Sequence, residues 1–248
     1  MIEIESERTI MSDYSPVWPH GEIVKEFEGI YVVRGTNLTS YQDIQIQHSR
    51  NMIIIESGNN LTLINTVRLD EEGLKKLDNL GTVKQIMRIG AYHGRDDRFY
   101  LDRYEADFWT VSVDEKEANT RNYRVHHLAN GNELPIKNSQ FFMFEHSLPA
   151  EGFLYIDAHE GIIITCDSIK NWTKVDKFFS EDTAKLALAS GEISKARISS
   201  VWVNATGVQK ADFECLLKLR FKHLISAHGD ILRNTAYNDV RDSVAQLR

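Results

Sequence analysis

Hydrophobic residues in the first third of the chain come in short runs of strand length. The runs GIYVVRG (29–35), NMIIIES (51–57) and NLTLINT (60–66) are rich in Val, Ile, Tyr and Thr. β-Branched and aromatic residues favour strands, so each run predicts one strand. Gly and Asn in the SGNNL sequence between the last two runs tolerate positive φ, which predicts a hairpin turn there.

The periodicity then changes to that of a helix. Leucines line one face of a helix predicted over residues 69–81, with Gly81 as its C-terminal cap. The run VKQIMRIG (83–90) predicts the next strand. A loop containing YHGRDDRFYLDRY (92–104) follows, and ADFWTVSV (106–113) predicts a further strand. The resulting β-α-β order is typical of an α/β layer.

The second half repeats this alternation. Strands are predicted at SQFFMFEH, GFLYIDA, GIIITCDS and HLISAHG, with HEG as a hairpin turn. Helices are predicted at 177–188, 211–221 and 234–248, whereas RISSVWVNA (197–205) fits either a strand or a helix. Short, closely spaced strands with inserted helices predict a mixed α/β layout, not a doubly wound parallel sheet. The phosphate-binding pattern GxGxxG is absent from the sequence.

Length and composition agree with one ordinary globular domain. The chain has 248 residues, of which 42% are hydrophobic and 26% charged, enough to bury a sizeable core. We expect a single domain over residues 1–248, or two tightly fused halves, with residues 1–20 as an irregular arm. Apolar residues near Trp172, Phe178 and Phe179, expected to be exposed, fit a dimer surface, a lid or an ordinary amphipathic helix, so a homo-oligomer is left open.

Charge and cysteine content narrow the classes of function. The 36 acidic and 29 basic residues give a net charge of -7, which argues against binding a nucleic-acid backbone. No apolar run approaches the roughly 18 residues that span a bilayer, and glutamates near the N-terminus are unlike a signal peptide. Two cysteines are too few for a disulfide scaffold. We expect a cytoplasmic protein whose partner is a small molecule, not nucleic acid or a membrane.

Histidines and aspartates gather in turns that follow predicted strands. The turns are YHGRDDR (92–98), EHSLP (145–149), CDS (166–168) and SAHG (226–229). Loops at the ends of buried strands are where a rigid scaffold positions functional groups. Their recurrence therefore predicts one shared site.

The order and context of these turns resemble the metallo-β-lactamase superfamily, which includes glyoxalase II. The resemblance spans nearly all of residues 29–240. It implies a four-layer αββα sandwich of mixed sheets with helices on the outer faces. That family has a His-x-His-x-Asp-His turn, a histidine before a hairpin, an aspartate after a strand and a late histidine turn. The resemblance implies these metal ligands at the matching positions: His93, Asp97, His146, Asp167 and His228.

Two metal-binding histidines of the family pattern are replaced here by Arg95 and Arg98. Arginine stays protonated and offers only donors, so neither side chain can ligate a cation. The family layout implies that each of two metals would keep two ligands of its own and share Asp167. Three protein ligands and a water suffice for a catalytic zinc, but nearby guanidinium charges repel a cation. We therefore expect at most one divalent metal, with zinc ahead of iron or manganese, or none.

Two functions of different classes remain. With a metal, the resemblance implies a hydrolase whose metal-activated water attacks a small ester, thioester, lactone or phosphoester, with Asp97 orienting the water. Without a metal, Arg95 and Arg98 would pair with Asp97 and Asp167. That arrangement would be either a structural remnant or a non-catalytic clamp in which the arginines hold an anionic small molecule.

Three further residues near these turns are expected to play structural roles. Cys166 stands where the family commonly has glycine, and we expect a buried inert thiol, with a redox or metal role as the minor alternative. Asp96 and Asp102 flank the first turn, and we expect them to pair with Arg98 or Arg103.

Overall fold

The computed structural model describes residues 14–41, 43–112 and 122–247. Its strands are β1 (His20–Phe27), β2 (Ile30–Tyr41), β3 (Ile44–Ser57), β4 (Asn60–Ile64), β5 (Thr82–Arg88), β6 (Asp107–Thr110), β7 (Val125–His127), β8 (Ser139–Met143), β9 (Gly152–Ile156), β10 (Ile162–Thr165) and β11 (His223–Ser226). Its helices are α1 (Glu71–Leu80), α2 (Asp97–Tyr104), α4 (Glu181–Ala189), α5 (Ser200–Thr206), the 3-10 helix η1 (Lys210–Phe213), α6 (Glu214–Leu217) and α7 (Ala236–Ala245). Residues 1–13 of the expected arm lie outside the described residues.

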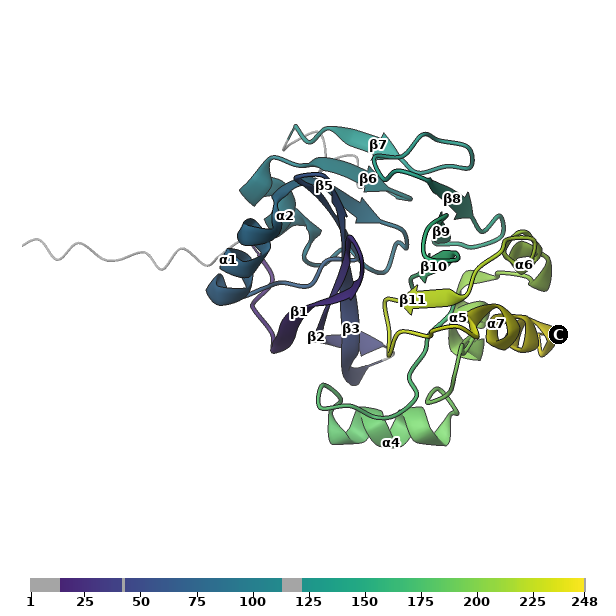
Figure 1. Cartoon of the computed structure of the whole chain (residues 1–248). Helices are drawn as coiled ribbons and strands as arrows, with labels where there is room; N and C mark the ends of the chain where they lie inside the picture. The colour runs from purple at the N-terminus through teal and green to yellow at the C-terminus, as the bar shows by residue number, and fades with distance from the viewer. Residues whose placement is uncertain (1–13, 42, 113–121, 248) are drawn as a thin grey trace, which may run out of the picture.

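The described strands form two mixed sheets (Figure 1). The first has the order β1-β2-β3-β4-β5-β6-β7, with antiparallel neighbours from β1 to β4 and parallel neighbours from β4 to β7. The second has the order β11-β10-β9-β8, in which β10 and β11 run parallel and the other neighbours antiparallel. This arrangement confirms the predicted mixed layout.

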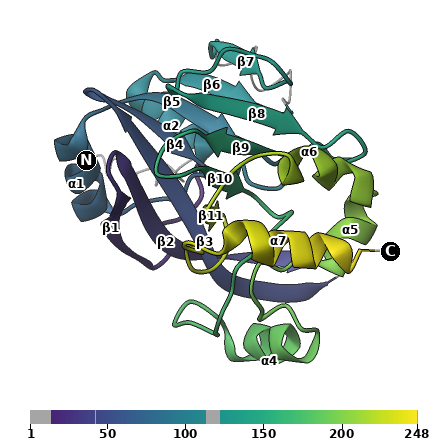
Figure 2. The same cartoon turned by 45° about the vertical axis from the view of Figure 1, so that its right-hand side comes forward.

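Three apolar cores hold the layers together. The central core lies between the sheets and joins Ile53 of β3 to Ile164 of β10. A second core packs the first sheet against α1 and α2 through Leu74 and Tyr100. A third packs the second sheet against α5, α6 and α7, which lie on the far side from α1 and α2 (Figure 2). The order helix, sheet, sheet, helix confirms the αββα sandwich.

Both predicted hairpin turns are present. Strands β3 and β4 pair antiparallel with Ser57 opposite Asn60, and Gly58 between them has a φ of 63°. Strands β9 and β10 also pair antiparallel, and all three residues of the HEG turn have positive φ. A Cβ at Gly161 of this turn would overlap the carbonyl oxygen of Arg220, so the turn requires glycine.

The sequence prediction of a loop over residues 92–104 is wrong in its second half, where α2 forms. The buried side of this helix carries the polar Asp97 beside Tyr100 and Leu101. Charged residues therefore occur on both sides of the helix and hide its apolar period. An ion pair between the partly buried Arg98 and Asp102, one turn apart at 3.9 Å, supports the helix.

Other elements differ from their predictions in extent. Strand β1 occupies a segment to which the sequence assigned no strand. The segment that fits either a strand or a helix contains α5, which Ser199 caps by accepting from the backbone N–H of Trp202. The helix predicted at 211–221 is shorter than expected, because it divides into η1 and α6 and ends at Leu217. Helix α4 starts later than predicted, after its N-cap Ser180.

Of the three aromatic residues expected to be exposed, Trp172, Phe178 and Phe179, the first two are buried. Trp172 and Phe178 are 3% and 6% exposed. The Trp172 indole N–H donates to Ser49 Oγ at 2.9 Å, and its ring contacts those of His48 and His228. These contacts bury the indole against β3, so Trp172 is part of the body of the protein and not of an exposed dimer surface.

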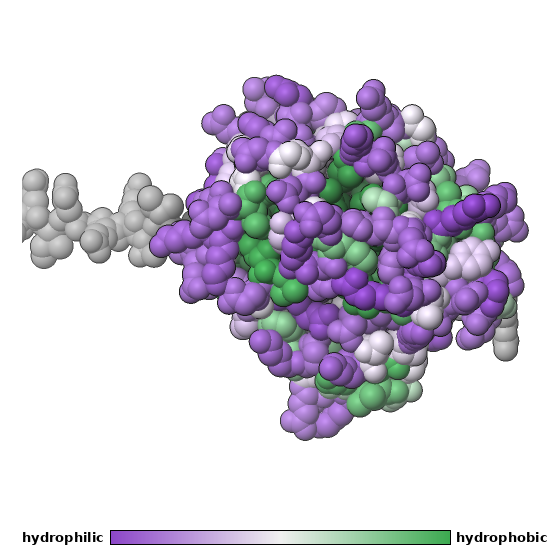
Figure 3. Space-filling model, viewed as in Figure 1, coloured by the Kyte–Doolittle hydropathy of each residue, from purple (hydrophilic) through white to green (hydrophobic). Residues whose placement is uncertain are grey.

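The surface is mostly hydrophilic on the face seen in Figure 3, with scattered hydrophobic areas, one of them over α4 at the bottom. On α4, Leu186 and Leu188 are among the exposed large hydrophobic side chains. None of the helices in the described residues has the length and apolar character needed to cross a membrane.

Candidate metal site

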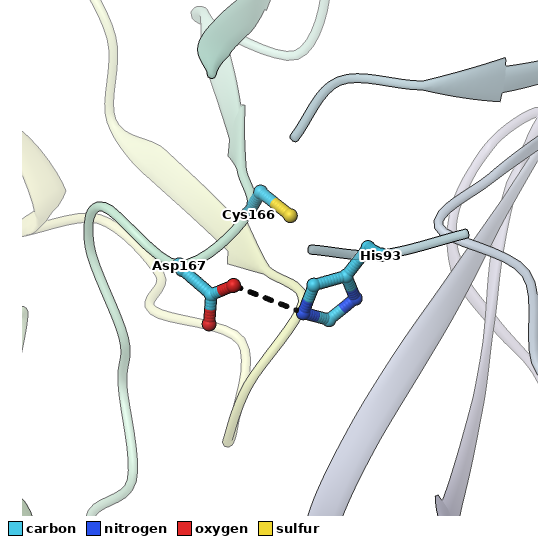
Figure 4. A group of neighbouring side chains, drawn as sticks. All are labelled: His93, Cys166 and Asp167. Carbon is cyan, nitrogen blue, oxygen red and sulfur yellow. Dashed lines mark ion pairs between the residues drawn. The ribbon is translucent and has the colours of Figure 1, made fainter. Parts of the chain in front are cut away.

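Three of the predicted ligands meet at one edge of the sandwich. His93 lies in the turn between β5 and α2, Asp167 follows β10, and His228 follows β11. The Nε2 atoms of His93 and His228 are 3.1 Å apart. The Asp167 carboxylate approaches both rings, with Oδ1 3.0 Å from His228 Nε2 and Oδ2 3.4 Å from His93 Nε2. Figure 4 shows the His93 ring turned toward this carboxylate.

The orientation of His228 leaves a nitrogen lone pair facing the carboxylate. Its Nδ1 lies 3.0 Å from the carbonyl oxygen of Ser49, which only accepts, so Nδ1 carries the hydrogen. Burial lowers the pKa of His228 to about 4, so the ring is neutral at neutral pH. Its Nε2 faces Asp167 Oδ1 at 3.0 Å, and a proton or a metal ion between the two atoms relieves the repulsion of their lone pairs.

The spacing of these atoms fits a metal ion. Tetrahedral ligands at zinc distances of about 2.0–2.1 Å are separated by about 3.3 Å, close to the three separations observed here. His93 Nδ1 is buried and has no hydrogen-bond partner in the described residues. The His228 ring, in contrast, is oriented by the Ser49 carbonyl in the way that metal-binding histidines usually are.

Asp167 is held as a carboxylate. Burial opposes its ionisation, but the surrounding His93 imidazole and Lys170 ammonium outweigh burial and hold the pKa of Asp167 well below its usual range. Lys170 Nζ lies 3.6 Å from Asp167 Oδ1. The site therefore keeps one anionic ligand at all ordinary pH values.

Cys166 lies beside His93 and Asp167, which agrees with the minor alternative of a metal role and not with the leading expectation of an inert thiol. His93, Cys166 and Asp167 each offer one ligand atom, and these atoms lie within 4.8 Å of one another. The thiol is buried, and burial raises its pKa well above the usual value. It donates to the side-chain oxygen of Asn65 at 3.8 Å. Its position directly before Asp167 was the available signal in the sequence.

The carboxylate of Asp97 is engaged elsewhere. It is 1% exposed, and it accepts from Thr66 Oγ1 at 2.6 Å and from Arg88 Nε at 2.7 Å. The expected pairing of Asp97 with Arg95 or Arg98 is therefore wrong, because Arg88 supplies the guanidinium. A Cβ at Gly94 would overlap the Arg88 guanidinium, so this glycine makes room for the pair. A role for Asp97 as a ligand or in orienting water stays a prediction.

His146 also has a partner of its own. Its Nδ1 lies 3.0 Å from Asp212 Oδ1, and the same oxygen accepts from the backbone N–H of Glu145. The His146 side chain is 42% exposed. This pairing ties the loop after β8 to the 3-10 helix η1, and His146 as a metal ligand stays a prediction.

The two arginines of the expected clamp take different positions. Arg98 lies over the Tyr14 ring and pairs with Asp102, as expected for that aspartate. Arg95 is exposed. Asp96 does not pair with Arg98 or Arg103 as expected, because its carboxylate pairs with the buried Arg50 at 3.5 Å.

A buried carboxyl group that no sequence pattern singles out lies behind the site. Glu151 is 2% exposed. Its Oε1 accepts from the backbone N–H of Ser168 at 2.6 Å, and its Oε2 accepts from the Trp202 indole at 3.2 Å. Burial, together with the nearby Asp167 charge, raises the pKa of Glu151 to about 8. Glu151 therefore supports the turn that carries Asp167.

The raised pKa of Glu151 predicts a pH dependence of stability. The group is protonated up to about pH 8 in the folded chain and only up to about pH 4.5 when unfolded. Its contribution to stability is therefore fully present below pH 4.5 and falls as pH rises through this window, by an amount on the order of a few kcal/mol. Urea titrations with an uncharged chelator present measure the slope. Glu151→Gln should reduce the slope of the unfolding free energy against pH between about pH 4.5 and pH 8. An unchanged slope would contradict the raised pKa of Glu151.

Comparison with known proteins finds matches in structure but none in sequence. No protein-family model matches the sequence, and no curated protein matches it. Solved structures do match over almost the whole chain. They include a metallo-β-lactamase from Erythrobacter litoralis (12% identity, TM-score 0.55, covering 94% of this chain and 96% of that one). Another, from Hirschia baltica, is 14% identical (TM-score 0.55, covering 90% and 97%).

A third similar structure is the metallo-β-lactamase FIM-1 from Pseudomonas aeruginosa in its mono-zinc form. It is 12% identical, with a TM-score of 0.53, and the match covers 93% of this chain and 96% of that one. At such identities the likeness shows a shared fold and leaves the chemistry to be argued from the residues.

Proposed function

Because the chain has the metallo-β-lactamase fold, we propose that it binds one divalent metal through His93, Asp167 and His228 and hydrolyses a small ester, thioester, lactone or phosphoester. The observation that carries this proposal is the convergence of His93 Nε2, His228 Nε2 and the Asp167 carboxylate, whose atoms lie 3.0–3.4 Å from one another. Zinc suits two imidazoles and a carboxylate, with manganese or iron as the other candidates.

The side chains divide the work at such a site. A bound divalent metal lowers the pKa of a bound water and so supplies a hydroxide nucleophile near neutral pH. The Ser49 carbonyl fixes the His228 ring so that Nε2 faces inward. Lys170 Nζ, 3.6 Å from Asp167 Oδ1, places a positive charge beside the ligands, and such a charge would stabilise an oxyanion that develops near it. The rings of His48 and Trp172 pack against His228 and keep water from its buried side.

A single metal is favoured over two. The Asp97 carboxylate, which the family resemblance implies as a ligand of the second metal, is neutralised by Arg88. The two positions where the resemblance implies further histidines carry Arg95 and Arg98, which cannot ligate. The mono-zinc form of FIM-1 shows that a protein of this fold can hold one zinc.

Substitution with cobalt(II) tests whether the site is open for catalysis. We expect three protein ligands and a water, so the absorption spectrum of the cobalt-loaded protein should lack a sulfur-to-cobalt charge-transfer band. Cys166 is not a ligand in this proposal, so Cys166→Ser should leave the spectrum unchanged. A charge-transfer band that disappears in Cys166→Ser would indicate a closed site with four protein ligands, and that outcome would contradict the hydrolase.

A further inference from the structure

Two guanidinium groups converge beside the metal ligands on one neutral acceptor. With its amide oriented to satisfy its hydrogen bonds, Asn37 Oδ1 accepts from Arg50 Nη1 at 2.8 Å and from Arg95 Nε at 3.2 Å. Asn37 belongs to β2 and Arg50 to β3, whereas Arg95 lies in the turn before α2. Three separate segments thus bring one nitrogen of each guanidinium to the same amide oxygen.

The charge of Arg50 is only partly compensated. The residue is 4% exposed, and its Nη2 donates to the Thr66 carbonyl oxygen at 2.7 Å. Its nearest carboxylate, that of Asp96, is 3.5 Å away. The same Asp96 oxygen, Oδ2, also accepts from the backbone N–H of Arg68 at 3.0 Å, so the carboxylate oxygen that faces Arg50 is shared. Arg50 Nε has no hydrogen-bond partner in the part of the chain that the structure describes.

Asp96 supplies the one carboxylate within ion-pair distance of these two guanidiniums among the described residues, so one of the two positive charges has no anionic partner there. The amide oxygen of Asn37 carries only a partial charge, whereas a carboxylate or phosphate would accept from both guanidiniums with full charge. Arg95 is exposed and Asn37 is half-buried, so an anion can reach this position from solvent.

The position lies on two segments that also hold or orient the metal ligands. Ser49, the residue before Arg50, orients His228 through its carbonyl oxygen. On the other side, Arg95 stands two residues after His93, in the same turn. A molecule bound at the metal could therefore place a charged group against the two guanidiniums.

We propose that Arg50 and Arg95 form an oxyanion subsite, in which a carboxylate or phosphate group of the substrate replaces the Asn37 amide as acceptor. Arg98 is not part of it, because Arg98 pairs with Asp102. The substrate class that follows is an anionic ester or phosphoester. This assignment of substrate rests on the proposed hydrolase, whereas anion binding by itself does not.

Thermal unfolding with added anions tests the subsite. Metal-free full-length protein, prepared with an uncharged chelator, is titrated with inorganic phosphate and separately with acetate, each against chloride at equal ionic strength. We expect phosphate or acetate to raise the Tm, and whichever is stronger identifies the preferred oxyanion. Arg95→Gln should weaken the apparent Kd by about ten-fold or more, since a charge-assisted hydrogen bond is lost.

Two variants make the result specific. Asn37→Asp places a permanent carboxylate between the guanidiniums, so it should raise the Tm without added anion and abolish the anion response. Arg124→Gln removes an exposed arginine whose partner is Asp107 and should respond like the unaltered protein. An unaltered protein that shows no anion response, or an Arg95→Gln variant that responds equally, overturns the subsite. Because the protein is metal-free, failure of metal binding would overturn the hydrolase alone.

Discussion

Replacing Arg88 by alanine is expected to lower the free energy of unfolding by about 3 kcal/mol. The Asp97 carboxylate is 1% exposed, and Arg88 Nε is its charged partner at 2.7 Å. Removing one partner of a buried ion pair leaves an uncompensated charge, which costs more than the pair itself contributes. The guanidinium also lies over the Phe108 ring, so packing is lost as well. Chemical denaturation followed by fluorescence measures the change.

The double variant Arg88→Met, Asp97→Asn is the matched control for this prediction. It removes both charges and keeps most of the side-chain volume. The Thr66 hydroxyl, which now donates to the Asp97 carboxylate, can donate to the amide oxygen of the new asparagine instead. We expect the double variant to recover most of the stability that Arg88→Ala loses. If the double variant is as unstable as Arg88→Ala, the loss of stability comes from lost packing and not from leaving the Asp97 charge unpaired.

Replacing His228 by alanine is expected to reduce metal affinity by about 100-fold or more and to abolish any hydrolytic activity. It removes one of three ligand atoms, together with the ring that the Ser49 carbonyl orients. His126→Ala is a suitable control, because His126 pairs with Asp107 and stacks on Trp109, away from the ligands. Competition with a chromophoric chelator measures the affinity. Equal metal affinity in both variants would exclude His228 as a ligand.

The fold could be predicted from the sequence because its strands and turns are locally consistent. Runs such as IIIT in β10 are buried throughout, and the HEG turn has the positive φ values that its sequence allows. Helix α2 was missed because its buried side carries Asp97, a polar residue that interrupts the apolar period. The helix predicted at 211–221 was too long because the apolar residues that follow α6 also pack in the core, although they are not helical.

The sequence predicted those site residues that can be recognised one at a time, from their position directly after a strand. His93, Asp167 and His228 each follow a strand, and the sandwich brings those strand ends together. The partners of Asp97 and His146 could not be foreseen, because Arg88 lies within a strand and Asp212 within a 3-10 helix far along the chain. Arg50 and Glu151 follow no recognisable sequence pattern, since only their burial distinguishes them from other arginines and glutamates.

Metal content is the most direct test of the central claim that His93, Asp167 and His228 hold one ion. Elemental analysis would be made on protein purified without chelator or affinity nickel, and again after addition of zinc, manganese or iron(II). We predict about one equivalent per chain, lost in Asp167→Ala. Absence of metal under every condition would contradict the account and leave the arginine subsite as the basis of a non-catalytic, anion-binding function.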